Sequence, residues 1–193
     1  MVNKALIVTD VINDFMPGGA LPVPKGDTVI EPINRMIDWC KNEENWIIIL
    51  VGDWHPKDSK HFEKWPVHAV ANTVGAEFHP DLKILPNAII IYKGLDPNED
   101  GYSALEGIAW NGFELDDILK GFSVEEVFVC GVATEICVKV TALDAVKNGY
   151  KTFILLDACR ALTPESGEKA VKEMKEVGVV ITTTDDIIKR EEK

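Results

Sequence analysis

The chain has 193 residues, of which 46% are hydrophobic, and it carries a formal net charge of −12 at pH 7. This length and apolar share suit one compact domain, residues 1–193, that buries a substantial core. The acidic balance repels phosphate backbones, and no cluster of lysines or arginines offsets it. These features exclude nucleic acid as a partner class.

The sequence gives no sign of a membrane or an oxidising compartment. The longest apolar run, residues 46–51, is far too short to span a bilayer, and residues 1–10 lack the long apolar stretch of a secretory signal. The four cysteines have no CxxC spacing, which argues against a disulfide scaffold and against a thioredoxin-type redox pair. We therefore expect a cytoplasmic protein with no membrane partner, and the sequence leaves open whether it forms a homo-oligomer.

Short runs of branched apolar residues alternate with amphipathic stretches along the chain. The runs predict strands buried on both faces, and the stretches predict helices. Thr163 followed by Pro164 predicts a helix start, Thr28 followed by Glu31 predicts a capping box, and two glycines, at positions 149 and 178, predict helix ends. The alternation predicts an α/β fold with a six-stranded, mostly parallel sheet and helices on both faces. In chain order, the predicted elements are strand 5–9, helix 29–42, strand 47–51, strand 88–92, strand 127–130, helix 135–148, strand 152–156, helix 165–176 and strand 179–182.

Reactive residues stand near the carboxyl ends of several predicted strands. Asp10 ends the first strand, Asp53 follows the second and Lys93 ends the third, while Cys137 comes shortly after the fourth. Ligands of open parallel sheets bind beyond this edge, so these side chains would converge there. Each residue taken alone also fits a structural role, as a turn cap, a solvated strand end or an ordinary buried cysteine. Two polar segments, 52–86 and 94–112, have the length that is usual for functional loops.

Cys137 has the most specific context for a nucleophile. The sequence GVAT, which ends at Thr134, predicts a tight turn from strand to helix, with Thr134 as N-cap and Cys137 in the first helical turn. The positive end of the helix dipole and unpaired backbone N–H groups lower a thiol's pKa there and can bind an oxyanion. Asp10 is then a candidate to take the thiol proton, and Lys93 a candidate to stabilise the resulting charge. Cys159, which begins the loop after the fifth predicted strand, is a weaker alternative nucleophile.

Three of the four histidines, His55, His61 and His68, fall within fourteen positions of one another, and they begin close to Asp53. Neutral imidazoles together with a carboxylate suit one borderline divalent ion, with zinc first and iron or manganese as alternatives. The spacing is only moderately specific, because histidine-rich and aromatic loops also occur as packing features. The fourth histidine, His79, fits a packing or capping role equally well.

A series of motifs extends across nearly the whole chain: DVINDF at 10–15, GGALPV at 18–23, DWHP at 53–56, WPVH at 65–68, YKG at 92–94, GYSAL at 101–105, GVATEICV at 131–138 and TALDA at 141–145. Together these motifs resemble the nicotinamidase branch of the isochorismatase-like cysteine hydrolases. Ile12, Ala69 and Leu105 depart from residues that are common in that family, which leaves the preference among aromatic amides open.

The resemblance implies an isochorismatase-like hydrolase fold and a metal-dependent cysteine amidohydrolase. Such an enzyme converts a small aromatic amide, nicotinamide or an analogue such as pyrazinamide, to its acid and ammonia through a thioester. Cys137 would attack the carboxamide carbon, Asp10 would accept the thiol proton, and Lys93 would position the pair. The resemblance also implies an oxyanion hole made by the backbone N–H groups of Ala133 and Cys137, and a cis peptide between Val132 and Ala133.

By the same resemblance, Asp53, His55 and His68 would bind the metal ion, and His61 would be a fourth ligand or a near neighbour. The ion would hold the pyridine nitrogen of the substrate rather than cleave the bond.

The resemblance also assigns the substrate contacts. Phe15 and Trp65 would wall the flat ring, Tyr102 would contribute to the rim, and Ala133 would lie beside the substrate. Plain core packing is the alternative for Phe15 and Trp65.

Three other functions remain open from the sequence. A metal-free member of the superfamily, acting on isochorismate or on an N-carbamoyl compound, would not need Asp53, His55 and His68 together. A dinucleotide-binding oxidoreductase fits the predicted sheet, but no GxGxxG follows the first strand. A non-enzymatic metal-binding or interaction protein would not require a thiol at a helix N-terminus beside an aspartate and a lysine.

Overall fold

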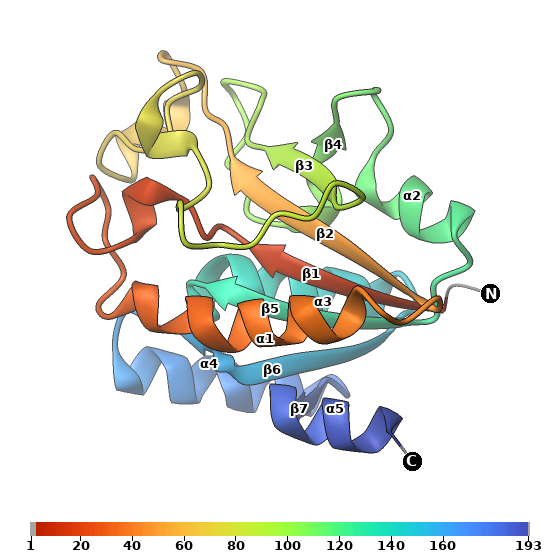
Figure 1. Ribbon diagram of the computed structural model, residues 1–193. Helices are drawn as coiled ribbons and strands as arrows, with labels where there is room; N and C mark the ends of the chain where they lie inside the picture. The colour runs from red at the N-terminus through yellow and green to blue at the C-terminus, as the bar shows by residue number, and fades with distance from the viewer. Residues whose placement is uncertain (1–2, 193) are drawn as a thin grey trace.

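A seven-stranded sheet forms the centre of the computed structural model, which describes residues 3–192. Neighbouring strands run parallel except for β3 and β4, which pair antiparallel (Figure 1). The strands, in their order across the sheet, are β4 (Ile108–Ala109), β3 (Ile89–Lys93), β2 (Trp46–Asp53), β1 (Lys4–Thr9), β5 (Glu126–Val132), β6 (Lys151–Arg160) and β7 (Val180–Thr182).

The predicted α/β fold and its mostly parallel sheet are confirmed, with one strand more than the six expected. The additional strand, β4, has only two residues, which is too short for an apolar pattern to reveal, and it exists because Ile108 and Ala109 pair with the end of β3. Strand β6 continues to Arg160, well beyond the predicted end at residue 156, after a register shift against β5. Cys159 therefore lies buried inside a strand and does not begin a loop.

Helices cover both faces of the sheet, as predicted. In Figure 1, α1 crosses in front of the sheet and α3 runs behind it; α5 packs against α1, and α4 packs against α3. Helices α3 and α4 end shortly before Gly149 and Gly178, which both have positive φ. Among residues 3–192, no helix is both long and apolar enough to cross a membrane. The helices are α1 (Ile30–Cys40), α2 (Leu115–Gly121), α3 (Lys139–Lys147), α4 (Pro164–Glu176) and α5 (Thr184–Glu191).

The two predicted helix starts have different outcomes. Thr163 caps α4 as expected, because its side chain accepts a hydrogen bond from the backbone N–H of Ser166. The capping box predicted at Thr28 and Glu31 is wrong. A turn of 3-10 helix (Gly26–Val29) precedes α1, and the Thr28 hydroxyl donates back to the carbonyl of Lys25.

The buried core holds the carboxyl ends of the central strands in place. Residues 5–9 of β1 and residues 127–132 of β5 are buried throughout, because helices cover both faces of these central strands. Parallel neighbours end at the same edge, so the segments that leave β1, β2, β3 and β5 begin side by side. Side chains at these strand ends therefore stand directly on the buried centre of the sheet.

Candidate active site

The strand-end residues singled out from the sequence meet in the structure. Asp10 directly follows β1, Asp53 and Lys93 are the last and mutually paired residues of β2 and β3, and Cys137 lies in the turn after β5. All four side chains are buried, and those of Asp10 and Lys93 are fully enclosed. Burial of two aspartates and a lysine together is costly unless they pair, so this group is a candidate catalytic site.

Lys93 holds the group together. Its Nζ lies 3.0 Å from Asp10 Oδ2, pairs with Asp53 Oδ1, donates to the Gly101 carbonyl at 2.9 Å and lies 3.5 Å from the Cys137 sulfur. An ammonium has three protons to donate and no acceptor, so these neighbours use its full capacity. The lysine therefore links both carboxylates to the thiol in a single charged cluster.

A sharp turn presents Cys137 to this cluster. Gly131 has a φ of +113°, and a Cβ there would lie 2.0 Å from the Thr9 carbonyl oxygen, so only glycine fits. The peptide between Val132 and Ala133 is cis, which confirms that expectation. The segment Thr134–Val138 then forms one π-helical turn ahead of α3, and its N-cap is Ala133; the prediction that Thr134 caps this helix is wrong.

The charges within the cluster set the protonation of Asp10 and Cys137. Burial, reinforced by the negative charge of Asp53, raises the pKa of Asp10 to about 7 despite the attraction of Lys93. Burial also raises the pKa of the Cys137 thiol well above its usual range, with Asp10 adding to the shift. The expectation of a lowered thiol pKa is thus wrong for this arrangement, because desolvation outweighs the nearby lysine. The resting thiol is protonated, beside a carboxylate that is partly ionised near neutral pH.

Lys93 and Asp53 are the permanently charged members of the cluster. Burial disfavours the charged form of both side chains, but the opposite charges of their partners outweigh this effect. The pKa of Asp53 therefore lies below its usual range, and the pKa of Lys93 lies well above its own. These two groups stay ionised while Asp10 can gain or lose a proton.

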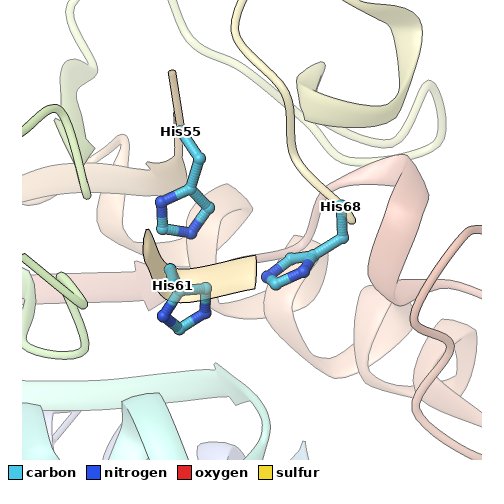
Figure 2. A group of neighbouring side chains, drawn as sticks. All are labelled: His55, His61 and His68. Atoms are coloured by element: carbon cyan, nitrogen blue, oxygen red, sulfur yellow. The ribbon is translucent and has the colours of Figure 1, made fainter. Parts of the chain in front are cut away.

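Three imidazoles form a second group next to the first. The nearest ring nitrogens of His55, His61 and His68 lie within 4.8 Å of one another, and Figure 2 shows the three rings turned toward one another. Each Nδ1 faces an oxygen acceptor: the carbonyl of Gly94 at 3.2 Å for His55, a carboxylate at 2.9 Å for His61, and a carbonyl at 2.6 Å for His68. These acceptors favour the tautomer with a proton on Nδ1, in which Nε2 keeps its lone pair.

These imidazoles are suited to hold a metal ion. Burial lowers the pKa of His61 and of His68, which keeps them in the neutral form that metals bind. Among residues 3–192, His55 Nε2 is a buried atom without a hydrogen-bond partner, and it lies 3.7 Å from Asp53 Oδ2. A carboxylate oxygen of Asp53 also lies within 4.8 Å of polar atoms of Asp10 and Cys137. The Asp53 carboxylate therefore lies between the imidazoles and the reacting cluster.

Gly94 makes room for the first of these rings. Its φ is +69°, and a Cβ at this position would lie 2.4 Å from His55 Cε1. Its carbonyl is also the oxygen that accepts the His55 Nδ1 proton. His79, in contrast, accepts a hydrogen bond from the Asp81 amide at 3.3 Å and takes no part in the three-imidazole group.

Both groups open onto one cavity of about 420 Å³. All four residues expected to contact a substrate, Phe15, Trp65, Tyr102 and Ala133, line it. The Trp65 indole donates to the Tyr102 hydroxyl at 2.9 Å, and the Phe15 ring lies 5.3 Å from the ring of His68. The cavity is therefore a narrow, mainly apolar slot whose lining also includes the Cys137 thiol, the Asp53 carboxylate and two of the imidazoles.

Sequence reasoning missed several lining residues. Leu21 and Val23 line the cavity, and they fall in the GGALPV motif that had been noted without a role. Ile136 precedes Cys137 directly, so its position could have been inferred from that of Cys137. Leu162 comes from the segment after β6, and no local pattern marks it.

Asp14 is a further residue that the sequence did not single out. One of its carboxylate oxygens accepts from the Ala69 amide at 2.8 Å, and the other accepts from the Ala20 amide at 3.2 Å. The side chain thereby ties the segment after β1 to the residue that follows His68. The motif DVINDF contains Asp14, but only the fold reveals what it contacts.

Comparison with known proteins places the chain in a family. The isochorismatase domain model matches residues 4–186. The nicotinamidase of Escherichia coli (strain K12) is 36% identical over 208 aligned residues, covering 96% of this chain and 97% of the relative. The pyrazinamidase of Pyrococcus horikoshii in complex with zinc superimposes with a TM-score of 0.85 at 43% identity, covering 94% of this chain and 99% of that one. PnC1 from L. infantum in complex with nicotinate gives a TM-score of 0.83 at 32% identity, covering 95% and 94%. The chain therefore belongs to the isochorismatase family and, within it, to the nicotinamidase branch of amide hydrolases.

Proposed function

We propose that this protein is a cysteine amidohydrolase that converts nicotinamide, or a close analogue such as pyrazinamide, to the corresponding acid and ammonia. One observation carries the proposal: the buried group of Asp10, Lys93 and Cys137 and the three imidazoles open onto the same slot. The relatives that are nicotinamidases, and the L. infantum relative that binds nicotinate, support this substrate class. The family match across residues 4–186 supports one hydrolase domain for the whole chain.

The first half of the reaction makes a thioester. The Cys137 sulfur attacks the carboxamide carbon while Asp10 takes the thiol proton, which suits a carboxylate whose pKa is about 7. Lys93 remains charged and offsets the negative charge that develops on the sulfur 3.5 Å away. The backbone N–H groups of Ala133 and Cys137 are the proposed oxyanion hole. Asp10 then gives its proton to the leaving nitrogen, the carbon–nitrogen bond breaks, and ammonia departs.

The second half uses water and restores the enzyme. Asp10, again ionised, takes a proton from a water molecule as its oxygen attacks the thioester carbon. The carbon–sulfur bond breaks, the sulfur recovers the proton from Asp10, and the acid is released. The net change is amide plus water to acid plus ammonia, so a single carboxylate with a near-neutral pKa serves both halves.

A divalent metal ion is part of the proposal, with zinc first and iron or manganese as alternatives. Asp53, His55 and His68 are the side chains that would hold it, with His61 as a fourth ligand or a near neighbour, because the imidazoles lie beside a carboxylate that stays ionised. When bound, the ion supplies a Lewis-acid contact for the ring nitrogen of the substrate. The zinc complex of the Pyrococcus horikoshii relative supports the choice of metal.

The slot suits a flat ring. Phe15 and Trp65 provide apolar walls, and the hydrogen bond from Trp65 to Tyr102 holds the indole in place. An aromatic ring between such walls gains dispersion and excludes water from the reacting carbon. A charged amide would bury its charge between apolar walls without a partner. A bulky aliphatic amide would not fit between the flat walls.

The test is ammonia release from nicotinamide by the purified protein, before and after chelation and with zinc restored. Turnover that is lost on chelation and regained with zinc is the expected result. Cys137→Ala should abolish turnover while the protein stays folded, whereas Cys159→Ala removes a different buried thiol and should leave turnover in place. Equal activity of Cys137→Ala and the parent protein would exclude Cys137 as the nucleophile, and no release from any pyridine or pyrazine amide would refute the substrate class.

A further inference from the structure

The three imidazoles differ in what holds their outer nitrogens. The Nδ1 atoms of His55 and His68 donate to backbone carbonyls, whereas the Nδ1 of His61 lies 2.9 Å from a side-chain oxygen, Oδ1 of Asp100. Within residues 3–192, His61 is the one member of this group with a carboxylate at its outer nitrogen. A backbone carbonyl cannot be removed by substitution, whereas a side chain can. The contribution of this hydrogen bond to the site can therefore be tested by mutation.

The carboxylate of Asp100 is itself held in place. Its second oxygen accepts from Lys64 Nζ at 2.6 Å, and the Lys64 amide donates to the His61 carbonyl at 3.0 Å. Asp100 lies in the segment after β3, while His61 and Lys64 lie in the segment after β2. The two segments are also joined by a backbone hydrogen bond from Lys60 to Pro97 of 2.8 Å, which does not involve Asp100. Substitution of Asp100 should therefore leave the segments docked.

A carboxylate can only accept hydrogen bonds, so this contact fixes the proton of His61 on Nδ1 and leaves the Nε2 lone pair directed into the group. Figure 2 shows the His61 ring turned toward the other two. A carboxylate behind a histidine also makes its free nitrogen a better donor to a metal, and such outer partners contribute about 10-fold to 100-fold to metal affinity. The other two rings face neutral carbonyls, so the partner of His61 should raise its affinity for a metal the most.

We propose that Asp100 is a positioning residue of the metal centre, which acts through His61 Nδ1 and makes His61 a direct ligand. This inference rests on the proposed metal site of the hydrolase. Asp100 itself contacts neither the substrate cavity nor the reacting cluster. Its contribution is to orient one ring and to raise the affinity of that ring for the ion.

The test measures zinc affinity of the metal-free protein by competition with a chromophoric chelator, which does not depend on turnover. Asp100→Ala should weaken zinc binding by about 10-fold to 100-fold. Asp100→Asn keeps an acceptor oxygen without the charge and should fall between Asp100→Ala and the parent protein. Glu99→Gln removes an exposed charge from the neighbouring residue and should bind zinc as the parent does. Equal affinity of Asp100→Ala and Glu99→Gln would overturn the proposal.

A double-mutant cycle separates action through His61 from a general effect on the site. In a His61→Ala background, Asp100→Ala should have no further effect on zinc affinity, since the ring through which it acts is gone. The same loss in both backgrounds would show that Asp100 acts by long-range charge or by folding, and would overturn the proposal. If Asp100→Ala does not fold, the same cycle with Asp100→Asn decides the matter. A parent protein that binds no zinc would refute the metal centre itself, whereas a zinc-binding parent with an unaffected Asp100→Ala refutes only the role of Asp100.

Discussion

Replacement of Asp10 by asparagine should make the protein more stable while it removes the activity. Asparagine has nearly the same shape as aspartate but remains neutral, so it mimics the protonated form that the buried site prefers. Burial and the charge of Asp53 raise the pKa of Asp10 from an ordinary value of 3.8 to about 7, even with Lys93 at 3.0 Å. The ionised carboxylate is therefore a destabilising group that the fold retains.

The magnitude follows from the linkage between pKa and stability. A group with a raised pKa in the folded state contributes stability that is fully present below pH 3.8 and is lost as the pH rises to about 7. The difference of about three pKa units corresponds to about 4 kcal/mol, at 1.36 kcal/mol per unit. Asp10→Asn should thus match the parent protein near pH 4 and exceed its free energy of unfolding by up to about 4 kcal/mol at pH 7 and above.

Urea unfolding of the metal-free proteins, followed across this pH range, measures the effect. Other carboxylates titrate equally in both proteins and cancel in the difference. Asp58→Asn, at an exposed site with no hydrogen bond or ion pair shown within residues 3–192, is the matched control and should leave stability unchanged. A stability difference for Asp10→Asn that is independent of pH, or a loss of stability at neutral pH, would refute the assignment of a raised pKa to Asp10.

Other outcomes follow from the same geometry. The kcat/KM of the parent enzyme should rise with pH through about 7, because Asp10 must be ionised to take the thiol proton, and a flat profile from pH 5 to 9 would contradict its role as base. Gly94→Ala should weaken zinc binding in chelator competition, since the new Cβ would lie 2.4 Å from His55; Gly149→Ala, with positive φ but nothing within 4 Å, should leave zinc binding intact. Thr163→Ala should lower the free energy of unfolding by about 1 kcal/mol without changing turnover, because it removes the cap of α4 but touches no site residue.

The raised thiol pKa sets the order of proton transfer and attack in the mechanism proposed for Cys137. A thiol near the start of a helix was expected to have a lowered pKa, but Cys137 is enclosed with two carboxylates as well as a lysine. Desolvation therefore keeps the thiol protonated at rest, and in the proposed mechanism Asp10 removes this proton during attack. A buried, protonated thiol is also less exposed to oxidation than a resting thiolate.

The sequence by itself determined the fold class, the six longer strands and the location of the reacting groups. Buried parallel strands and amphipathic helices have local periodicities, which a few consecutive residues are enough to express. Asp10, Asp53 and Lys93 could be placed at one edge because parallel strands must end together there. The two-residue strand β4 is too short to show such a pattern, so it was not predicted. The ten-residue strand β6 extends beyond its apolar run, so its predicted end came too early.

Only the tertiary structure decided how the site residues pair. The pKa of Asp10 depends on burial and on Asp53, more than forty positions away, and the sequence carries no measure of either. The same holds for the contact of Asp100 with His61, which joins segments from two different strands. Spacing along the chain suggested which residue types could react, but desolvation and pairing arise between segments that meet only on folding. The physical chemistry of the site is therefore a property of its packing, on a framework that local sequence patterns already specify.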